Sequence, residues 1–203
     1  MNQEKVKYTV IGESVDEITE KRSQFIAYCR HVKTRGEAET YVKKIKEKHR
    51  DARHNVYAYV TESPYSAGYS DDGEPSGTAG PPILSLIKSM NLYNIVIVVT
   101  RYFGGILLGT GGLARAYRQS AKKSIACNSI VILKKYSDYK LDCDYKSYER
   151  VRSALQNLGG LIENTLFSDR ITADVKLPND KGLQYSEDYE YVITFLSTAE
   201  SGN

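Results

Sequence analysis

Residues 100–118, TRYFGGILLGTGGLARAYR, restrict the possible folds of this chain more than any other stretch. The continuous apolar run NIVIVVT (94–100) leads into them, and such a run is typical of a strand that is buried on both faces. Two glycine clusters follow the strand, and a helix is predicted from about residue 112 to residue 127. The chain is therefore expected to contain a central strand that a glycine-rich turn joins to a helix.

This glycine-rich turn has two interpretations. A helix N-terminus presents unpaired backbone N–H groups and the positive end of the helix dipole, and glycines let a phosphate group approach that backbone closely. In this interpretation Arg101 and Arg115 would flank the anion with their planar guanidinium groups. The candidate binding residues are Arg101, Gly104, Gly105, Gly109, Thr110, Gly111, Gly112, Arg115, Arg118 and Lys122. Alternatively, the glycines serve only tight turns and close packing of the strand on the helix, and the residues alone fit both interpretations.

Charge is distributed unevenly along the chain. Residues 75–137 contain no Asp or Glu but eight Lys and Arg. Residues 1–134 carry 20 basic and 13 acidic side chains, whereas residues 135–203 carry 8 basic and 12 acidic ones. We therefore predict two domains, 1–134 and 135–203, with a linker near 134–138. The basic first domain favours a polyanion as a partner, and the acidic second domain favours a basic protein partner.

An acidic loop is predicted just before the interval that lacks carboxylates. Residues 62–80 are dense in Gly, Ser, Pro and Asp, which indicates a long loop. Its polar candidates are Asp71, Asp72, Glu74, Ser76 and Thr78. The three carboxylates could hold Mg²⁺, pair with the arginines of the glycine-rich turn, or occupy a plain solvated turn. The sequence leaves these three alternatives open.

No catalytic residue, metal site or cofactor is predicted. The Ser, Cys and His residues show no arrangement of a nucleophile with a base, and the three histidines lack metal-ligand spacing with the cysteines. The three cysteines form no C-x-x-C pair, which favours a reducing compartment and a cytoplasmic location. The start of the chain shows no signal peptide, and no apolar run is long enough to span a bilayer. A binding protein is thus favoured over an enzyme, with catalysis left open.

The remaining pattern predicts an α+β fold. In the first domain we expect two strands within 6–30, a helix at 36–50, a strand at 55–61, a helix that starts at Pro81 and Pro82, and a strand at 129–136. In the second domain we expect a strand at 139–145, a helix at 146–158, and strands at 161–168 and 170–177. This βαββ order predicts a small ferredoxin-like unit. Residues 183–198 fit a second helix, and no final strand is predicted.

Two long strings carry a family resemblance. DDGEPSGTAGPPIL (71–84) and VVTRYFGGILLGTGGLARAY (98–117) resemble the signature of the IMPACT family, also called the YigZ family. The blocks EKRSQFIA (20–27) and DARHNVYAY (51–59) are similar to further recurring blocks of that family. The resemblance covers most of residues 10–135.

The resemblance implies both a fold and a role. The first domain would be similar to the second domain of the fifth small-subunit ribosomal protein, a fold that also occurs in elongation factor G and in small-molecule kinases. The second domain would be ferredoxin-like and similar to the last domain of elongation factor G. Eukaryotic relatives regulate translation, so the resemblance favours a translation-associated protein that binds RNA, the ribosome or a translation factor. The kinases keep an alternative open, an enzyme that acts on a phosphorylated small molecule or nucleotide through the same glycine-rich turn.

Overall fold

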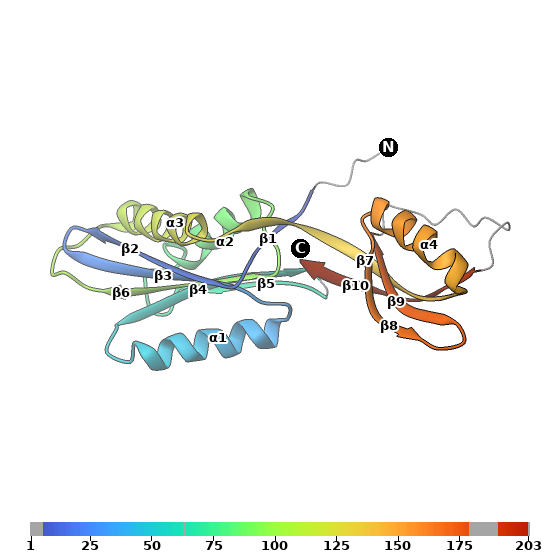
Figure 1. Cartoon of the computed structure of the whole chain (residues 1–203). Helices are drawn as coiled ribbons and strands as arrows, with labels where there is room; N and C mark the ends of the chain where they lie inside the picture. The colour runs from blue at the N-terminus through green and yellow to red at the C-terminus, as the bar shows by residue number, and fades with distance from the viewer. Residues whose placement is uncertain (1–5, 63, 179–190, 203) are drawn as a thin grey trace. The chain divides into compact units, whose positions relative to one another are not determined.

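The structure is a computed structural model that describes residues 6–62, 64–178 and 191–202, the last range through its backbone alone. The chain divides into two compact units, residues 1–133 and residues 134–201. Helices and strands carry the labels of Figure 1. Within the described residues, none of the helices combines the length and the apolar character needed to cross a membrane.

A five-stranded antiparallel sheet forms the centre of the first unit (Figure 1). In spatial order its strands are β2 (Glu13–Glu20), β3 (Ser23–His31), β6 (Ile95–Tyr102), β4 (His54–Glu62) and β5 (Tyr65–Ser70). The middle strand is β6, and its first seven residues are all buried. The predicted buried strand at 94–100 is therefore confirmed.

Helices cover both faces of this sheet, which explains why β6 is apolar throughout. Helices α2 (Gly80–Ser89) and α3 (Thr110–Ala126) pack on one face, and α1 (Arg35–Lys48) packs on the other (Figure 1). Successive side chains of a strand point to opposite faces, so Ile97 joins the core under α2 and α3, whereas Val96 and Val98 join the core under α1. The strand that precedes the glycine-rich turn is thus packed between two apolar layers.

Two predictions for the first unit need correction. Residues 62–80 are not one loop, because β5 occupies 65–70 and pairs with β4. This edge strand has the Ser and Gly content of a loop, and a Cβ on Gly68 would lie 2.7 Å from the ring of Tyr59. The start of the chain forms three strands instead of two, since β1 (Tyr8–Val10) precedes β2 and β3.

A single strand, β7 (Ile130–Cys143), replaces the two strands and the linker that were predicted between 129 and 145. Residues 130–132 pair with β1, and residues 136–143 pair with β9 (Ile171–Pro178). The division between the two units falls within β7. The change of charge near 134–138 therefore marks no break in the backbone.

The second unit has the strand order β10-β7-β9-β8, with α4 (Tyr145–Asn157) packed on β8 (Leu161–Phe167) and β9. The strand β10 (Tyr191–Gly202) contradicts the expectation that no final strand follows. Residues 191–198 are strand and not helix, and the rest of the predicted helix, 183–190, lies outside the described residues. The β-branched and aromatic content of YVITFLST (191–198) suits a strand beside β7.

Candidate functional site

A cavity of about 410 Å³ lies where the acidic loop, the end of β6 and the start of α3 meet. The two motifs that stand out in the sequence thus converge on one site. The residues that line it are Arg53, His54, Gly73, Glu74, Pro75, Arg101, Phe103, Leu107, Leu108, Gly109, Thr110 and Leu113. The sequence did not predict Arg53, His54 or Phe103 as site residues, although Arg53 and His54 stand in the block DARHNVYAY.

A buried ion pair contributes to the wall of this cavity. Glu74 Oε1 accepts hydrogen bonds from Arg101 Nη1 at 2.6 Å and from the Tyr117 hydroxyl at 2.7 Å. The side chains of Arg101 and Glu74 are only 7% and 3% exposed. The Arg101 guanidinium stacks over the rings of Phe25 and Phe103, 5.4 and 5.5 Å from their centroids. Burial and the Glu74 carboxylate raise the pKa of Tyr117, so its hydroxyl stays protonated and donates.

This pairing changes the role expected of Arg101. Its charge is neutralised by Glu74, so it does not offer a free cation to an anion. Of the three alternatives for the carboxylates of the acidic loop, Glu74 therefore fits pairing with an arginine of the glycine-rich turn. The Arg101 Nη2 lies 3.5 Å from Ser23 Oγ, whereas its buried Nε has no hydrogen-bond partner among the described residues. One buried donor beside the cavity is therefore left unsatisfied.

The other two carboxylates of the acidic loop have separate partners. Asp71 accepts hydrogen bonds of 2.8–3.0 Å from three backbone N–H groups between residues 77 and 80, which ties the loop to the start of α2. Asp72 accepts from Lys46 Nζ at 2.6 Å and from the backbone N–H of Asn55 at 2.7 Å. Different protein donors thus hold each carboxylate, which disfavours a shared Mg²⁺. In the part of the chain that the structure describes, no three His, Cys, Asp or Glu side chains gather as metal ligands.

The two hydroxyl residues of the loop lie in different surroundings. Thr78 is buried, and its hydroxyl donates to the carbonyl oxygen of Pro75 at 2.6 Å. Ser76 is exposed. Thr78 therefore stabilises the loop, and neither residue lines the cavity.

His54 lines the cavity next to Glu74. Its Nδ1 lies 2.8 Å from the carbonyl oxygen of Asp72 and donates to it, so Nε2 is the acceptor when the ring is neutral. That Nε2 lies 3.9 Å from Glu74 Oε1. A neutral imidazole with an available Nε2 is one arrangement that a general base can have.

The glycines of the turn serve different purposes. A Cβ on Gly104 would lie 2.0 Å from the carbonyl carbon of Arg22, so packing requires this glycine. Gly105 and Gly109 have φ angles of +83° and +71°, which other residues rarely adopt. Gly111 has neither constraint, because its φ is not positive and a Cβ there would meet no described atom within 4 Å. The packing interpretation therefore holds for Gly104, whereas Gly111 leaves the backbone of α3 open to close approach.

The first turn of α3 meets this cavity without a side-chain cap. The N-cap residue is Gly109, which has no side chain to accept a hydrogen bond from the first N–H groups, and the first turn holds no acidic residue. Gly109 and Thr110 line the cavity, while a Cβ on Gly112 would lie 3.1 Å from Leu108 Cβ. An uncapped N-terminus leaves its backbone donors and the positive end of the helix dipole available to an anion.

Behind this start, α3 carries a row of exposed basic residues, Arg115, Arg118 and Lys122, which we call the α3 basic row. Its members follow Gly111 at intervals of four, three and four residues, so all four positions lie on one face of the helix. Within the described residues, none of the three side chains takes part in an ion pair. Arg115 is not among the residues that line the cavity, whereas the anion-site interpretation of the sequence would have it beside Arg101.

Carboxylates do lie near α3 in space, although residues 75–137 contain none. Strand β2 packs beside α3 and carries Asp16, Glu17 and Glu20. Asp16 Oδ2 accepts a hydrogen bond of 3.5 Å from Cys127 Sγ at the end of α3. The basic character of this surface is therefore a property of the exposed α3 basic row and not of the whole face.

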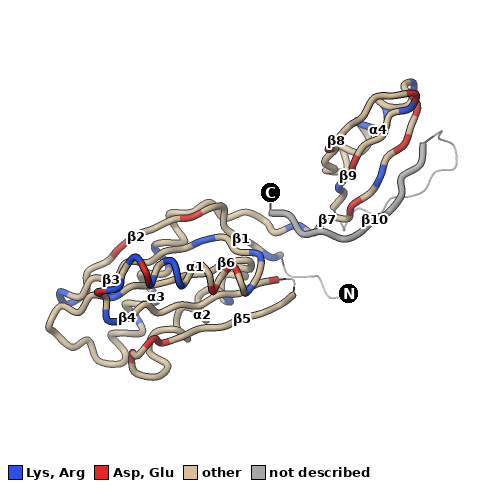
Figure 2. The backbone as a smooth tube through the Cα atoms, turned by 90° about the horizontal axis from the view of Figure 1, so that it is seen from below, with Lys and Arg blue, Asp and Glu red and all other residues tan. Residues whose placement is uncertain are grey.

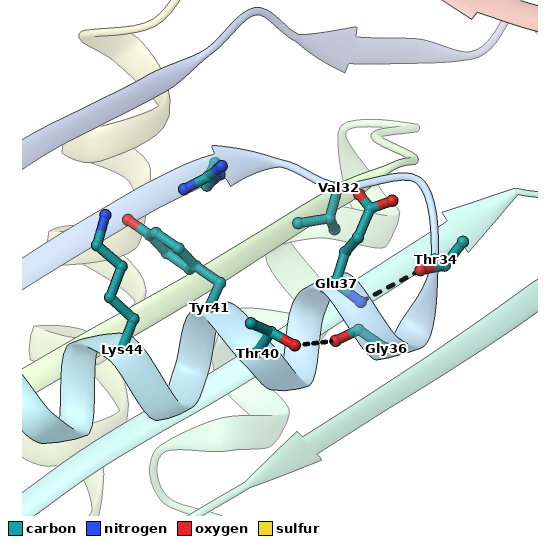
Figure 3. A pocket seen from close by; sticks show the side chains of 8 residues that line it. Val32, Thr34, Gly36, Glu37, Thr40, Tyr41 and Lys44 are labelled. Atoms are coloured by element: carbon teal, nitrogen blue, oxygen red, sulfur yellow. Dashed lines mark hydrogen bonds between the residues drawn. The ribbon is translucent and has the colours of Figure 1, made fainter.

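A second cavity, of about 420 Å³, lies at the start of α1, and Figure 3 shows Tyr41 and Lys44 projecting from that helix. Here the helix is capped by its own side chains. Thr34 Oγ1 accepts from the N–H of Glu37 at 3.2 Å, and the Glu37 carboxylate accepts from the N–H of Lys33 at 2.8 Å. Helix α1 carries both signs of charge along its length (Figure 2). These opposite charges make α1 a weaker candidate for a polyanion than the α3 basic row.

Comparisons with known proteins agree on one family. The family described as the Impact N-terminal domain matches residues 21–125. The IMPACT family member YigZ of Escherichia coli (strain K12) is 35% identical over 175 residues, which are 85% of this chain and 85% of YigZ. Protein IMPACT of Homo sapiens is 35% identical over 98 residues, which are 45% of this chain and 30% of that protein.

A solved structure supports the mixed α+β fold. This crystal structure of a hypothetical protein superposes with a TM-score of 0.63 and 30% sequence identity, covering 88% of each chain. The family match at 21–125 includes the acidic loop, the glycine-rich turn and every residue that lines the cavity beside α3. The chain belongs to the IMPACT family, as YigZ does.

Proposed function

We propose that this chain is a cytoplasmic, translation-associated regulatory protein that binds RNA, free or in the ribosome, through its first unit. Residues 1–134 would be the IMPACT-type domain, with a fold like that of the second domain of the fifth small-subunit ribosomal protein. Residues 135–203 would be a ferredoxin-like domain. The strand order β10-β7-β9-β8, with α4 directly after β7 in the chain, supports that assignment.

The α3 basic row is the observation that carries this proposal. Arg115, Arg118 and Lys122 are exposed, aligned and unpaired within the described residues. From Gly111 to Lys122 the helix rises by about 16 Å, enough to follow several phosphates of one strand. Cations that no carboxylate on the same helix offsets are available to phosphate groups.

Salt dependence tests the proposal. We expect the affinity for RNA to fall steeply between about 50 and 200 mM salt, because phosphate contacts release counterions. The triple variant R115A/R118A/K122A should bind more weakly, with a salt slope smaller by about 0.7–0.9 for each phosphate that the variant no longer neutralises. A double variant of exposed basic residues, K43A in the opposite helix α1 and R50A just after that helix, is the control and should keep both values. Binding that does not depend on salt, or a triple variant that behaves like the control, would contradict the proposal.

The cavity supports a second candidate, an enzyme that acts on a phosphorylated small molecule. The observation that favours it is His54, whose Nε2 is an available acceptor on the cavity wall beside the uncapped start of α3. Sugar phosphates and nucleotides that raise the melting temperature would be followed for turnover with and without Mg²⁺. We expect H54Q to abolish turnover and to keep the ligand-induced rise in melting temperature. Ligands that bind without being converted would exclude this candidate.

A further inference from the structure

The start of α3 can receive a phosphate group at the cavity. The N–H groups of its first turn have no intrahelical acceptor, and no side chain of the N-cap residue competes for them. Gly111 adds no side chain to that turn, although neither backbone conformation nor packing requires a glycine at this position. Arg53 lines the same cavity, is exposed and forms no ion pair with the described residues. Backbone donors and one unpaired cation therefore meet at this end of the cavity.

A separate observation points to a ligand in the same place. Arg101 is 5% exposed and lines the cavity, yet its Nε has no hydrogen-bond partner within the described part of the chain. Buried donors are nearly always satisfied, because an unsatisfied one costs free energy. Since Glu74 already holds Nη1, the missing acceptor at Nε is one that the described residues do not supply. Because the Nε atom itself has almost no exposed surface, a ligand oxygen or ring nitrogen in the cavity would supply it only after a small shift of the Arg101 side chain.

The mouth of the cavity carries exposed apolar side chains. Phe103 is 46% exposed and Leu107 is 82% exposed, and both line the cavity together with Pro75 and Leu108. The Phe103 ring already contacts the Arg101 guanidinium, which helps to hold it in place. An exposed, supported aromatic ring is the surface on which proteins stack single nucleobases.

The size and charge of the cavity limit what it can hold. A volume of about 410 Å³ is near the lower end of small-molecule sites, which span roughly 300–1,000 Å³, and it suits one nucleotide unit. Glu74 is the acidic side chain of the lining, and its charge is neutralised by Arg101 at 2.6 Å. The lining therefore accepts a phosphate group and a flat apolar ring together.

We propose that this cavity binds a nucleoside phosphate, with the phosphate at the first turn of α3 and the base against Phe103. A free nucleotide and an unpaired nucleotide of an RNA strand share this chemistry. In the second case the inference rests on the proposed function, because the α3 basic row would bind the rest of the strand. The cavity would then make the protein selective for RNA with an accessible unpaired base.

The ligand class is tested by titrating the full chain, by calorimetry, with AMP, UMP, ribose 5-phosphate and inorganic phosphate. We expect the two nucleotides to bind at least roughly tenfold more tightly than ribose 5-phosphate, because only they carry a base that can stack. Nucleotides that bind no better than ribose 5-phosphate would overturn the assignment of the base to Phe103.

Two variants with a matched control locate the site. G111A adds a methyl group to the first turn of α3, beside the N–H groups proposed to bind the phosphate, and should weaken nucleotide binding about tenfold. G36A makes the same change at the same helical position of α1 and should not weaken it. F103L keeps an apolar side chain but removes the ring, and it should also weaken nucleotide binding about tenfold. Melting temperatures confirm that the variants are folded. Equal nucleotide affinity in G111A and G36A would overturn the proposal.

Oligonucleotides separate this inference from the proposed function. Single-stranded RNA should bind more tightly than a duplex of the same length, and F103L should remove that preference. If RNA binds through the α3 basic row and F103L changes the affinity neither for RNA nor for mononucleotides, the cavity inference is wrong and the proposed function stands. If mononucleotides bind with the expected decrease in G111A and F103L but RNA does not bind, the cavity inference stands and the proposed function is wrong.

Discussion

The starts of α1 and α3 differ although both helices follow strands of the same sheet and pack on its two faces. Both have glycine as their second residue, Gly36 in α1 and Gly111 in α3, and added methyl groups would meet no close neighbour at either position. Helix α1 is capped by Thr34, whereas α3 begins after Gly109 and has no side-chain cap. One start is thus completed by its own side chains, and the other leaves donors for a group from outside.

The ion pairs at the starts of α1 and α3 also differ, in how far they are exposed to water. Arg35 and Glu39 form an exposed pair of 2.7 Å in α1, while Arg101 and Glu74 form a buried pair of 2.6 Å beside the start of α3. Similar distances have different consequences, because water screens the exposed pair and burial removes that screening. Loss of the buried pair beside the start of α3 should therefore lower the free energy of unfolding much more than loss of the exposed pair in α1.

The largest expected effect comes from breaking the buried pair. R101A leaves the Glu74 carboxylate buried with the Tyr117 hydroxyl as its one hydrogen-bond donor among the described residues. Removing one partner of a buried pair typically costs about 3–5 kcal/mol. Urea unfolding should show this decrease in the free energy of unfolding. The control is R35A in α1, which should lose less than about 1 kcal/mol because its pair with Glu39 is exposed. Similar losses in R101A and R35A would remove this difference between the two regions.

A medium effect is expected from removing the cap of α1. T34A takes away the oxygen that accepts from the N–H of Glu37, and such a loss typically costs about 1 kcal/mol. The matched change at the start of α3 is T110A, which removes an exposed hydroxyl that caps nothing and should change the free energy of unfolding by less than about 0.5 kcal/mol. Urea unfolding of both variants compares them directly, and an equal loss in T110A would show that α3 is capped after all.

The sequence predicted this comparison only in part. The period of apolar residues and the run at 94–100 predicted the helices and the central strand, because burial on defined faces leaves a pattern in the chain. The glycines were ambiguous because their roles depend on neighbours that are distant in sequence: Gly104 lies against the backbone at Arg22, and Gly111 lies against nothing described. The pairing of Arg101 with Glu74 was one of three open alternatives, and only the fold decides among them.

The sequence did not predict two strands, β5 and β10, or the cavity residues that are distant from the glycine-rich turn in the chain. Strand β5 has the Ser and Gly content of a loop, and residues 191–198 of β10 fall in the range for which the sequence predicts a helix. Arg53 and His54 reach the cavity because β4 pairs with β6, so that His54 lies opposite Arg101. A pairing register of this kind is set by the whole sheet, and no local pattern around His54 reveals it.

A smaller effect is expected from acid, and it extends the comparison to the other end of α1. The C-cap residue is His49, and burial, followed by the nearby Lys48, lowers its pKa. Because Tyr102 donates to Asp51, it accepts from His49 Nδ1, and His49 Nε2 accepts from Tyr28. The folded protein thus binds the proton more weakly than the unfolded chain, so stability is full above the unfolded pKa near 6.5 and falls as the pH drops below it.

Unfolding by urea at pH 7.5 and at pH 5.5 measures this dependence. The wild type should be less stable at pH 5.5, and H49Q should lose less between the two pH values because its side chain does not titrate. Burial also lowers the pKa of His31, so part of the dependence should persist in H49Q. A dependence of the same size in H49Q and in the wild type would show that His49 does not contribute.

The smallest stability effects, and the sharpest test of the comparison, come from the two glycines. G36A and G111A should each raise the free energy of unfolding by a few tenths to about 1 kcal/mol, because alanine restricts the unfolded chain and fits both helices without a clash. Added AMP should then separate them, since a ligand of the native state raises the melting temperature more the more tightly it binds. G36A should keep the rise seen in the wild type, and G111A should lose most of it. An equal rise in both variants would mean that AMP does not bind against the backbone at Gly111. A selective loss would mean that the ligand must reach the helix backbone there, which the glycine allows at a small cost in stability.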